Sequence, residues 1–296
     1  MMNIRKLTPA LTALALMGLL LTGCGTEQSS PSEPAPQETP NATEETQAAA
    51  PNYITAAEDF SNLQLDDPSL PVYDKLTLSE RRQQGLPTAL PQITPYKAKK
   101  VAYLTFDDGP DDNNTAAILD ILKEENVKAT FYVLGKNVAT YPAVAKRIFD
   151  EGHALGNHSY SHDYDRLYPN VNNFIAEMEK TDEIIRDLIG VRPLIIRAPG
   201  GRMSHFNQEY LTALANNGYV EHDWNVSSAD TAPNHPVAQD FVDNIQYQSV
   251  MDSAIILMHC SAGHEETVKA LPKIIQVLKE QGYSFGVITP MTPQPW

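Results

Sequence analysis

Short apolar runs alternate with segments of helical length from residue 99 to the end of the chain, and this alternation restricts the fold more than any other feature. The runs are rich in β-branched and aromatic residues, which favour strands. Strands separated by helices pair in parallel, either in a barrel or in an open sheet. The expected strands are 101–106, 129–134, 193–196, 219–224, 254–258 and 285–288, and the expected helices are 114–125, 142–150, 171–189, 207–217, 237–249 and 265–281.

The main domain, residues 99–296, is short for a complete barrel. A full eight-stranded barrel with its helices usually needs about 250 residues. We therefore predict an α/β fold in the form of a distorted, incomplete (β/α) barrel, similar to a TIM barrel, with about seven parallel strands.

Residues 1–23 have the features of a secretory signal. Arg5 and Lys6 precede an apolar run that is too short for a comfortable transmembrane helix. The run closes on Leu21-Thr22-Gly23-Cys24, which resembles the lipobox of bacterial lipoproteins. That resemblance implies cleavage before Cys24 and attachment of lipid to its sulfur. A plain signal peptide or an uncleaved helix is the alternative.

Two further segments precede the main domain. Residues 24–52 are rich in Pro, Ser, Thr and Glu and contain no Lys or Arg, so we expect a disordered spacer that cannot bury enough surface to fold. Residues 53–98 contain apolar residues interrupted by prolines, and we expect them to form a strap that packs on the main domain.

Charge and cysteine content restrict the partners. The net charge of -15 argues against nucleic-acid binding and against docking on anionic membranes through basic patches, so we expect membrane attachment through a lipid only. With two cysteines, Cys24 and Cys260, neither a disulfide framework nor a four-cysteine zinc site can form. Any metal must therefore bind to histidines and carboxylates. We expect a monomer.

Two adjacent carboxylates, Asp107 and Asp108, follow the expected strand 101–106 and precede the turn residues Gly109-Pro110. The carboxyl ends of parallel strands face the active site in α/β folds. Two neighbouring like charges repel unless a cation or a proton relieves them. A solvated turn is the alternative for an isolated Asp-Asp pair.

His158 and His162 are four residues apart, which predicts that they lie on one face of a helical turn. Taken alone, such a pair usually lies on the surface or in the core without a role in metal binding. Together with an aspartate from a strand end, it becomes a His-His-Asp set of the kind that holds Zn²⁺ or a similar ion and leaves positions open for water and substrate.

Five motifs in order resemble those of the polysaccharide deacetylases, the NodB-homology domain of carbohydrate esterase family four, including bacterial peptidoglycan N-acetylglucosamine deacetylases. The resemblance covers roughly residues 99–290, and five ordered motifs make coincidence very improbable. The motifs are Thr105-Phe106-Asp107-Asp108-Gly109-Pro110, His158-Ser159-Tyr160-Ser161-His162, Arg197-Ala198-Pro199-Gly200-Gly201, Trp224 to Asp230, and Leu257-Met258-His259.

The resemblance implies the roles of the metal ligands and of the base. Asp108, His158 and His162 would bind a divalent transition metal, with zinc expected and cobalt or nickel as alternatives. Asp107 would be the general base that activates a water at the ion. Arg197 would pair with Asp107, orient it and, as a neighbouring cation, keep it deprotonated.

The resemblance also implies a general acid. His259 would protonate the departing amine, and Asp230 would stabilise the protonated imidazole. Cys260 follows where many relatives carry Asp, and we interpret it as an inert small residue rather than a reactive thiol. His153 and His264 lie outside the motifs and are interpreted as a buried hydrogen-bonded histidine and a solvated loop histidine, respectively.

The implied substrate groove departs from the family in two places. Gly200, whose backbone N–H is the expected oxyanion donor, stands where relatives usually carry an aromatic residue. Thr231 stands in the position of the usual Trp. Leu257 matches the apolar side of the acetate pocket, and Trp224 is a candidate for the opposite side.

These features predict a metal-dependent hydrolase that removes N-acetyl groups from aminosugars of an N-acetylated envelope polysaccharide. A lipid anchor on the extracellular face of the bacterial cell membrane makes peptidoglycan the best-matched substrate. One alternative is deacetylation of another polymer, such as poly-N-acetylglucosamine or chitin oligomers. The other is a non-catalytic glycan-binding lipoprotein, although binding alone has no need of Asp107, Arg197 and His259.

Overall fold

The computed structural model describes residues 52–64 and 66–295. The predicted signal sequence 1–23, the lipid-attachment residue Cys24 and all but the last residue of the spacer 24–52 lie outside this range and stay predictions. Within the described part of the chain, no helix is both long enough and apolar enough to cross a bilayer.

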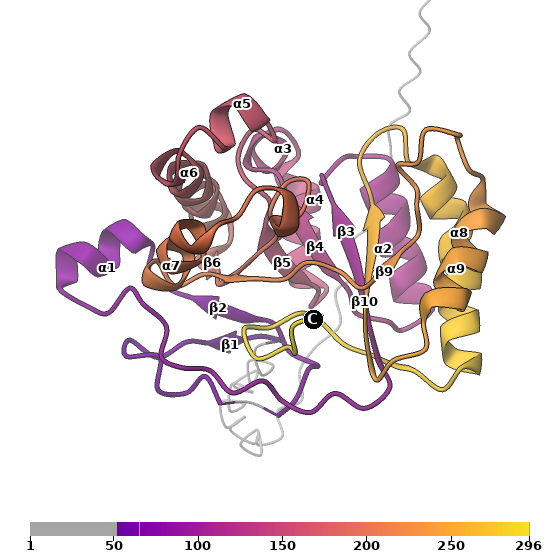
Figure 1. The fold of residues 1–296 in the computed structure, drawn as a ribbon, viewed down its shortest axis with the longest axis horizontal. Coiled ribbons are helices and arrows are strands. Elements are labelled where there is room, and N and C mark those ends of the chain that lie inside the picture. The colour runs from indigo at the N-terminus through magenta and orange to yellow at the C-terminus, as the bar shows by residue number, and fades with distance from the viewer. Residues whose placement is uncertain (1–51, 65, 296) are drawn as a thin grey trace, which may run out of the picture. The chain divides into compact units, whose positions relative to one another are not determined.

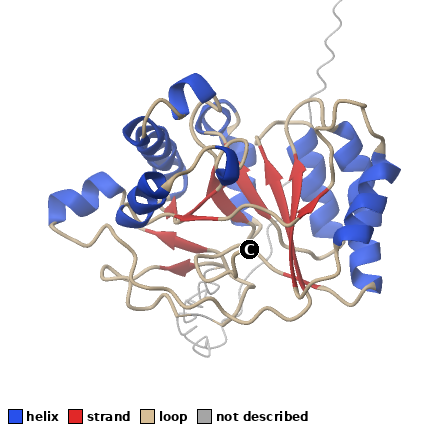
Figure 2. Ribbon diagram, in the orientation of Figure 1, coloured by secondary structure: helices blue, strands red, loops and turns tan. Residues whose placement is uncertain are grey.

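The main sheet has eight parallel strands, seven of which lie in the order β8-β7-β5-β4-β3-β10-β9, while β11 pairs with the start of β3 (Figures 1 and 2). The path runs from β8 to β9 without closing, so the predicted incomplete barrel of about seven parallel strands is confirmed. The strands are β3 (Val101–Asp107), β4 (Thr130–Val133), β5 (Ala154–Asn157), β7 (Ile195–Ile196), β8 (Val220–Glu221), β9 (Val226–Ser227), β10 (Ser253–His259) and β11 (Ser284–Phe285).

Helices cover the outside of the sheet. Figure 1 shows α2, α8 and α9 together on one flank and α3, α5, α6 and α7 on the other. The long predicted helices are all present, whereas the short α3 and α5 were not predicted. The helices of the main domain are α2 (Asn114–Glu124), α3 (Gly135–Thr140), α4 (Pro142–Asp150), α5 (Tyr164–Leu167), α6 (Val171–Ile189), α7 (Gln208–Asn216), α8 (Ala238–Gln248), α9 (Glu265–Glu280) and the 3₁₀ turn η1 (Arg202–Ser204).

The central strand β3 is buried along its whole length, which explains its nearly continuous apolar sequence. On its helix-facing side, Phe106 stacks on Phe131 of β4 with ring centroids 5.1 Å apart. On its other side, Tyr103 and Tyr132 join a second buried cluster that includes Val287 and Ile288 from the C-terminal segment. The sheet is therefore packed on both faces.

Residues 53–98 contain regular elements that the sequence did not predict. Strand β2 pairs in parallel with β1 and antiparallel with β6, so this segment shares a small sheet with residues that come after α6. Helix α1 begins with a capping box between Thr77 and Glu80 and ends at Gly85 in the left-handed conformation. These elements are β1 (Ile54–Thr55), β2 (Val72–Asp74), α1 (Leu78–Gln84) and β6 (Arg192–Pro193).

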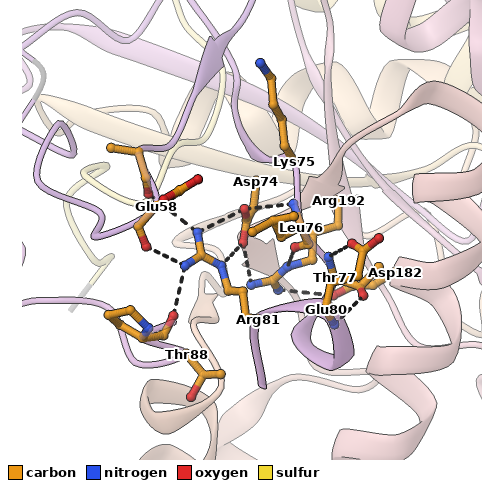
Figure 3. A network of polar contacts seen from close by, with 12 residues as sticks. Glu58, Asp74, Lys75, Leu76, Thr77, Glu80, Arg81, Thr88, Asp182 and Arg192 are labelled. Atoms are coloured by element: carbon orange, nitrogen blue, oxygen red, sulfur yellow. Dashed lines mark hydrogen bonds and ion pairs between the residues drawn. The ribbon is translucent and has the colours of Figure 1, made fainter. Parts of the chain in front are cut away.

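A buried network of charged side chains joins these elements (Figure 3). Arg81 donates to both carboxylate oxygens of Asp74, at 2.6 and 3.0 Å. Arg192 donates to Asp74 at 3.1 Å and to Asp182 at 3.3 Å. All four residues are at most 1% exposed. Two guanidinium groups thus face two carboxylates, which balances the charge in a place from which water is excluded.

Candidate active site

The site residues come from the carboxyl ends of four strands of the main sheet. Asp107 is the last residue of β3, and its register partner on β10 is His259. His158 directly follows β5, and Arg197 directly follows β7. Because parallel strands end at the same edge of a sheet, these side chains meet there, as the sequence predicted for Asp107 and Asp108.

The three expected metal ligands lie together. The Oδ1 atom of Asp108 is 3.6 Å from Nε2 of His158 and 3.4 Å from Nε2 of His162. Ligands at about 2.0–2.1 Å from a tetrahedral zinc ion are separated by roughly 3.4 Å, so the spacing fits such an ion. The same Asp108 oxygen is buried and has no hydrogen-bond partner in the protein, which a cation would supply. These residues could therefore hold a metal ion.

His158 is prepared for this task by its surroundings. Its Nδ1 faces the carbonyl oxygen of Arg197 at 2.8 Å, which leaves Nε2 directed toward Asp108. Burial lowers the pKa of His158 to about 3, despite the opposing effect of Asp108. The imidazole is thus neutral at physiological pH, and this is the form that binds metals.

The prediction that His158 and His162 lie on a helical turn is wrong. Strand β5 ends at Asn157, and both histidines lie in a loop. The loop brings the rings together because Ser159 and His162 adopt positive φ values of 74° and 57°. Asn157 stabilises the loop by accepting a hydrogen bond from the backbone N–H of Ser159 at 2.9 Å, and its amide donates to Asp182 at 2.7 Å. A four-residue spacing is therefore compatible with a folded loop as well as with a helix.

Asp107 lies beside the ligand group. Its Oδ1 accepts a hydrogen bond from Arg197 at 2.9 Å, and its Oδ2 is 3.8 Å from Nε2 of His158. Burial raises the pKa of Asp107 by more than Arg197 and His259 lower it. The net direction is therefore opposite to the one predicted from the arginine alone, because a pattern of residues does not contain the cost of desolvation.

Arg197 is fully buried, and each of its three guanidinium nitrogens donates to a fixed acceptor. Besides Asp107, it donates to the hydroxyl of Thr105 at 2.7 Å and to the carbonyl oxygens of His222 and Asp223 at 2.9 and 3.1 Å. The guanidinium also lies 4.3 Å from the centre of the Tyr132 ring. Arg197 is thus a support for one carboxylate oxygen of Asp107, and its contacts with Thr105 and Tyr132 could not be predicted from the motifs.

His259 and Asp230 form the second charged pair. Asp230 Oδ1 is 3.0 Å from His259 Nδ1, and Oδ2 accepts from the backbone N–H of His259 at 2.6 Å and from the hydroxyl of Thr267 at 3.2 Å. Burial by itself lowers the pKa of His259, but the hydrogen bond and the charge of Asp230 outweigh it and raise the pKa to about 9. His259 is therefore protonated at neutral pH and can donate a proton.

The predicted groove residues line one open cavity of about 320 Å³ above these groups. Gly200, Leu257, Trp224 and Thr231 all contribute to its wall. Tyr164, which the sequence did not single out, occupies the space beside Gly200: a Cβ atom at position 200 would lie 2.5 Å from the phenol oxygen of Tyr164. An aromatic ring thus stands beside the position where the family resemblance implies one, although it comes from the start of helix α5.

Two residues to which no chemical role was assigned, Cys260 and His153, are buried. Cys260 is fully buried, and burial raises the pKa of its thiol, which keeps it protonated. His153 is also buried, and its Nδ1 accepts from the backbone N–H of Ala129 at 3.2 Å. His264 is not simply a solvated loop histidine, because its ring stacks on that of His259 with centroids 5.1 Å apart.

The comparisons with known proteins agree with this geometry. A family model described as polysaccharide deacetylase matches residues 95–222. Two proteins of Bacillus cereus, both named peptidoglycan-N-acetylglucosamine deacetylase, are 37% and 38% identical to this chain; the alignments cover 64% and 67% of this chain and 69% and 70% of the relatives.

Solved structures of polysaccharide deacetylases are similar to this chain as well. A polysaccharide deacetylase from Bacillus cereus superposes with a TM-score of 0.60 at 36% identity, covering 64% of this chain and 92% of the other. The catalytic domain of a peptidoglycan N-acetylglucosamine deacetylase from Eubacterium rectale superposes with a TM-score of 0.64 at 30% identity, covering 69% and 95%. The chain therefore belongs to the polysaccharide deacetylase family.

Proposed function

We propose that this protein is a metal-dependent hydrolase that removes acetyl groups from N-acetylglucosamine residues of peptidoglycan and releases acetate. The observation that carries the proposal is the pairing of Asp107 with His259 on adjacent strands, each with its own charged partner, beside a set of metal ligands. The names of the relatives support peptidoglycan as the substrate.

The two paired residues have complementary proton chemistry. Asp107 would take a proton from the attacking water, and Arg197 would hold its carboxylate in place. The oxygen of this water bonds to the acetyl carbon, and the C–N bond breaks. His259 would give its proton to the leaving nitrogen, while Asp230 stabilises the imidazolium beforehand. The products are acetate and a free amine on the sugar.

A divalent ion held by Asp108, His158 and His162 would supply Lewis-acid chemistry, since it polarises the acetyl carbonyl and lowers the pKa of the attacking water. We propose zinc, because two imidazoles and one carboxylate at tetrahedral spacing suit it, with cobalt or nickel as substitutes. Gly200 would direct its N–H to the oxyanion, and Leu257 and Trp224 would enclose the methyl group of the acetyl.

Acetate release from purified peptidoglycan tests the proposal. We expect release that stops on chelation and returns on addition of zinc or cobalt. Asp107→Asn should abolish turnover while leaving the bound metal in place, and His158→Ala should lose the metal. No release from peptidoglycan under any metal would refute the proposal. Release from chitin oligomers alone would indicate another polymer, and glycan binding without release would indicate a binding protein.

We also propose that the protein acts at the extracellular face of the bacterial cell membrane, anchored through lipid on Cys24, and that it is a monomer. The support for the anchor is the sequence Leu21-Thr22-Gly23-Cys24. Cys24→Ala should move the protein from the membrane fraction to the medium. An unchanged membrane fraction would argue for an uncleaved helix.

A further inference from the structure

A second group of potential metal ligands lies next to the proposed acid. Asp230, His259 and His264 each offer a ligand atom, and these atoms lie within 4.8 Å of one another. Nδ1 of His259 is 3.0 Å from Oδ1 of Asp230, and Nδ1 of His264 is 3.8 Å from Oδ2. The group shares no residue with the Asp108, His158 and His162 set.

The position of His264 is defined by packing. Its ring is nearly parallel to that of His259, at 21°, and its side chain is 18% exposed. His264 and Asp230 also line a cavity of about 310 Å³ that lies beside the active-site cavity and opens to solvent. An ion can therefore reach the group without passing through the groove of Gly200 and Trp224.

The geometry also sets an order of affinity. In the catalytic set, the two histidine nitrogens lie 3.6 and 3.4 Å from a single oxygen of Asp108, close to the roughly 3.4 Å expected between ligands of a tetrahedral zinc ion. In the second group, the spacings of 3.0 and 3.8 Å run to two different oxygens of Asp230. His264 also directly precedes helix α9, whose N-terminus disfavours a cation. The carboxylate of Asp230 opposes that effect. The second group should thus bind an ion more weakly than the first.

We propose that Asp230, His259 and His264 form a second, weaker transition-metal site, and that its occupation inhibits the enzyme. The ion would take the place of the proton on Nδ1 of His259, and that proton would pass to solvent. Asp230 would then be engaged by the ion instead of stabilising an imidazolium. His259 would keep the proton on Nε2, but the N–H of a metal-bound neutral imidazole is a far weaker acid than that of an imidazolium. The leaving nitrogen would therefore not be protonated, and excess zinc would stop the reaction that catalytic zinc supports.

Zinc titration of the full-length protein tests this inference. Calorimetry should show one tight equivalent and a second, weaker one, and kcat should fall with little change in KM as the second is filled. His264→Gln should lose the second equivalent and shift the inhibiting zinc concentration by roughly tenfold or more. The matched control is His235→Gln, which changes an exposed histidine that lines the same cavity and should leave both equivalents unchanged.

The deacetylase activity and the second metal site can be refuted independently of each other, although the proposed inhibition rests on the proposed function. Absence of acetate release at one equivalent of zinc would refute the deacetylase, and a second equivalent lost only in His264→Gln would still support the site. A single equivalent in excess zinc would overturn the inference. So would equal inhibition of His264→Gln and the unchanged protein, or a rise in KM at constant kcat, since zinc would then act elsewhere.

Discussion

The charged network between the N-terminal segment and the barrel should be essential for stability, and Asp74→Asn tests this directly. Asp74 lies in β2, outside the predicted main domain 99–296, yet it is the shared partner of Arg81 and Arg192. The substitution keeps the size of the side chain but removes its charge. Asp182 would then be left to pair with Arg192, and Arg81 would lose its charged partner.

The expected cost is large. Asp74 accepts three hydrogen bonds from the two arginines, and both arginines are completely buried. Removal of one partner from a buried ion pair leaves a charge without compensation and costs about 3–5 kcal/mol. Domains of this kind are stable by only about 5–15 kcal/mol, so Asp74→Asn should remove a substantial part of the free energy of unfolding.

Urea unfolding followed by circular dichroism measures this difference. Asp150→Asn is the matched control, because Asp150 also pairs with a cation, Lys146, but is 51% exposed. Exposed pairs contribute roughly 0–1 kcal/mol, so the control should unfold close to the unchanged protein. If Asp74→Asn cost less than about 1 kcal/mol, residues 53–98 would not share the folding unit of the barrel, and the reasoning from buried charge would fail.

Three further predictions concern the site. Asp230→Asn removes the charge and the hydrogen bond that raise the pKa of His259 to about 9, so this pKa should fall. Because an acid must be protonated, the alkaline limb of the kcat/KM profile should move to lower pH. Gly200→Ala places a Cβ 2.5 Å from the Tyr164 oxygen at a φ of +78° and should raise KM and lower the unfolding temperature, and adding Tyr164→Phe should partly restore both. Arg197→Lys should lower kcat by roughly a hundredfold with unchanged metal content, because the ammonium group of lysine cannot replace the planar set of N–H donors of a guanidinium.

Elements with long apolar sequences could be predicted from the sequence, and the shortest ones could not. Strands β3 and β10 are buried in the centre of the sheet, so each appears as a continuous apolar run. Strand β5 has the sequence Ala-Leu-Gly-Asn, which has no β-branched residue, and only its neighbours hold it extended. The predicted strand 219–224 contains only the short β8, and β9 begins two residues beyond the predicted range, because the chain leaves β8 and reaches β9 across the open side of the barrel.

For the site, too, some features could be predicted from the sequence and others could not. The motifs predicted which residues would meet, because strand ends in a parallel sheet share one edge. They could not predict the direction in which the pKa of Asp107 shifts, which depends on burial. Nor could they predict the place of Tyr164 beside Gly200, which depends on how the start of helix α5 packs against the loop of Gly200. His264 was interpreted as a solvated residue because its contact with His259 is not a motif.

The adjacency of Asp107 and Asp108 also has a geometric requirement that the sequence does not show. Successive side chains of a strand point to opposite faces, so two neighbouring carboxylates would normally be separated by the sheet. Strand β3 ends at Asp107, and Asp108 adopts a φ of 70°, which allows both to line one cavity. Of the eight non-glycine residues with positive φ in the described chain, four lie in site loops: Asp108, Ser159, His162 and Ala229.

A positive φ costs a non-glycine residue of order 1–3 kcal/mol, and it persists only where the surrounding structure imposes it. Here hydrogen bonds from residues outside the motifs provide that constraint. Asn137 donates to the carbonyl of Asp108 at 2.7 Å, and Asn157 accepts from the N–H of Ser159 at 2.9 Å. Asn157 in turn is held by Asp182, which pairs with Arg192. The strained loops that present the ligands are thus connected to the same buried network that fixes residues 53–98 on the barrel, so the stability of that network and the geometry of the site should vary together.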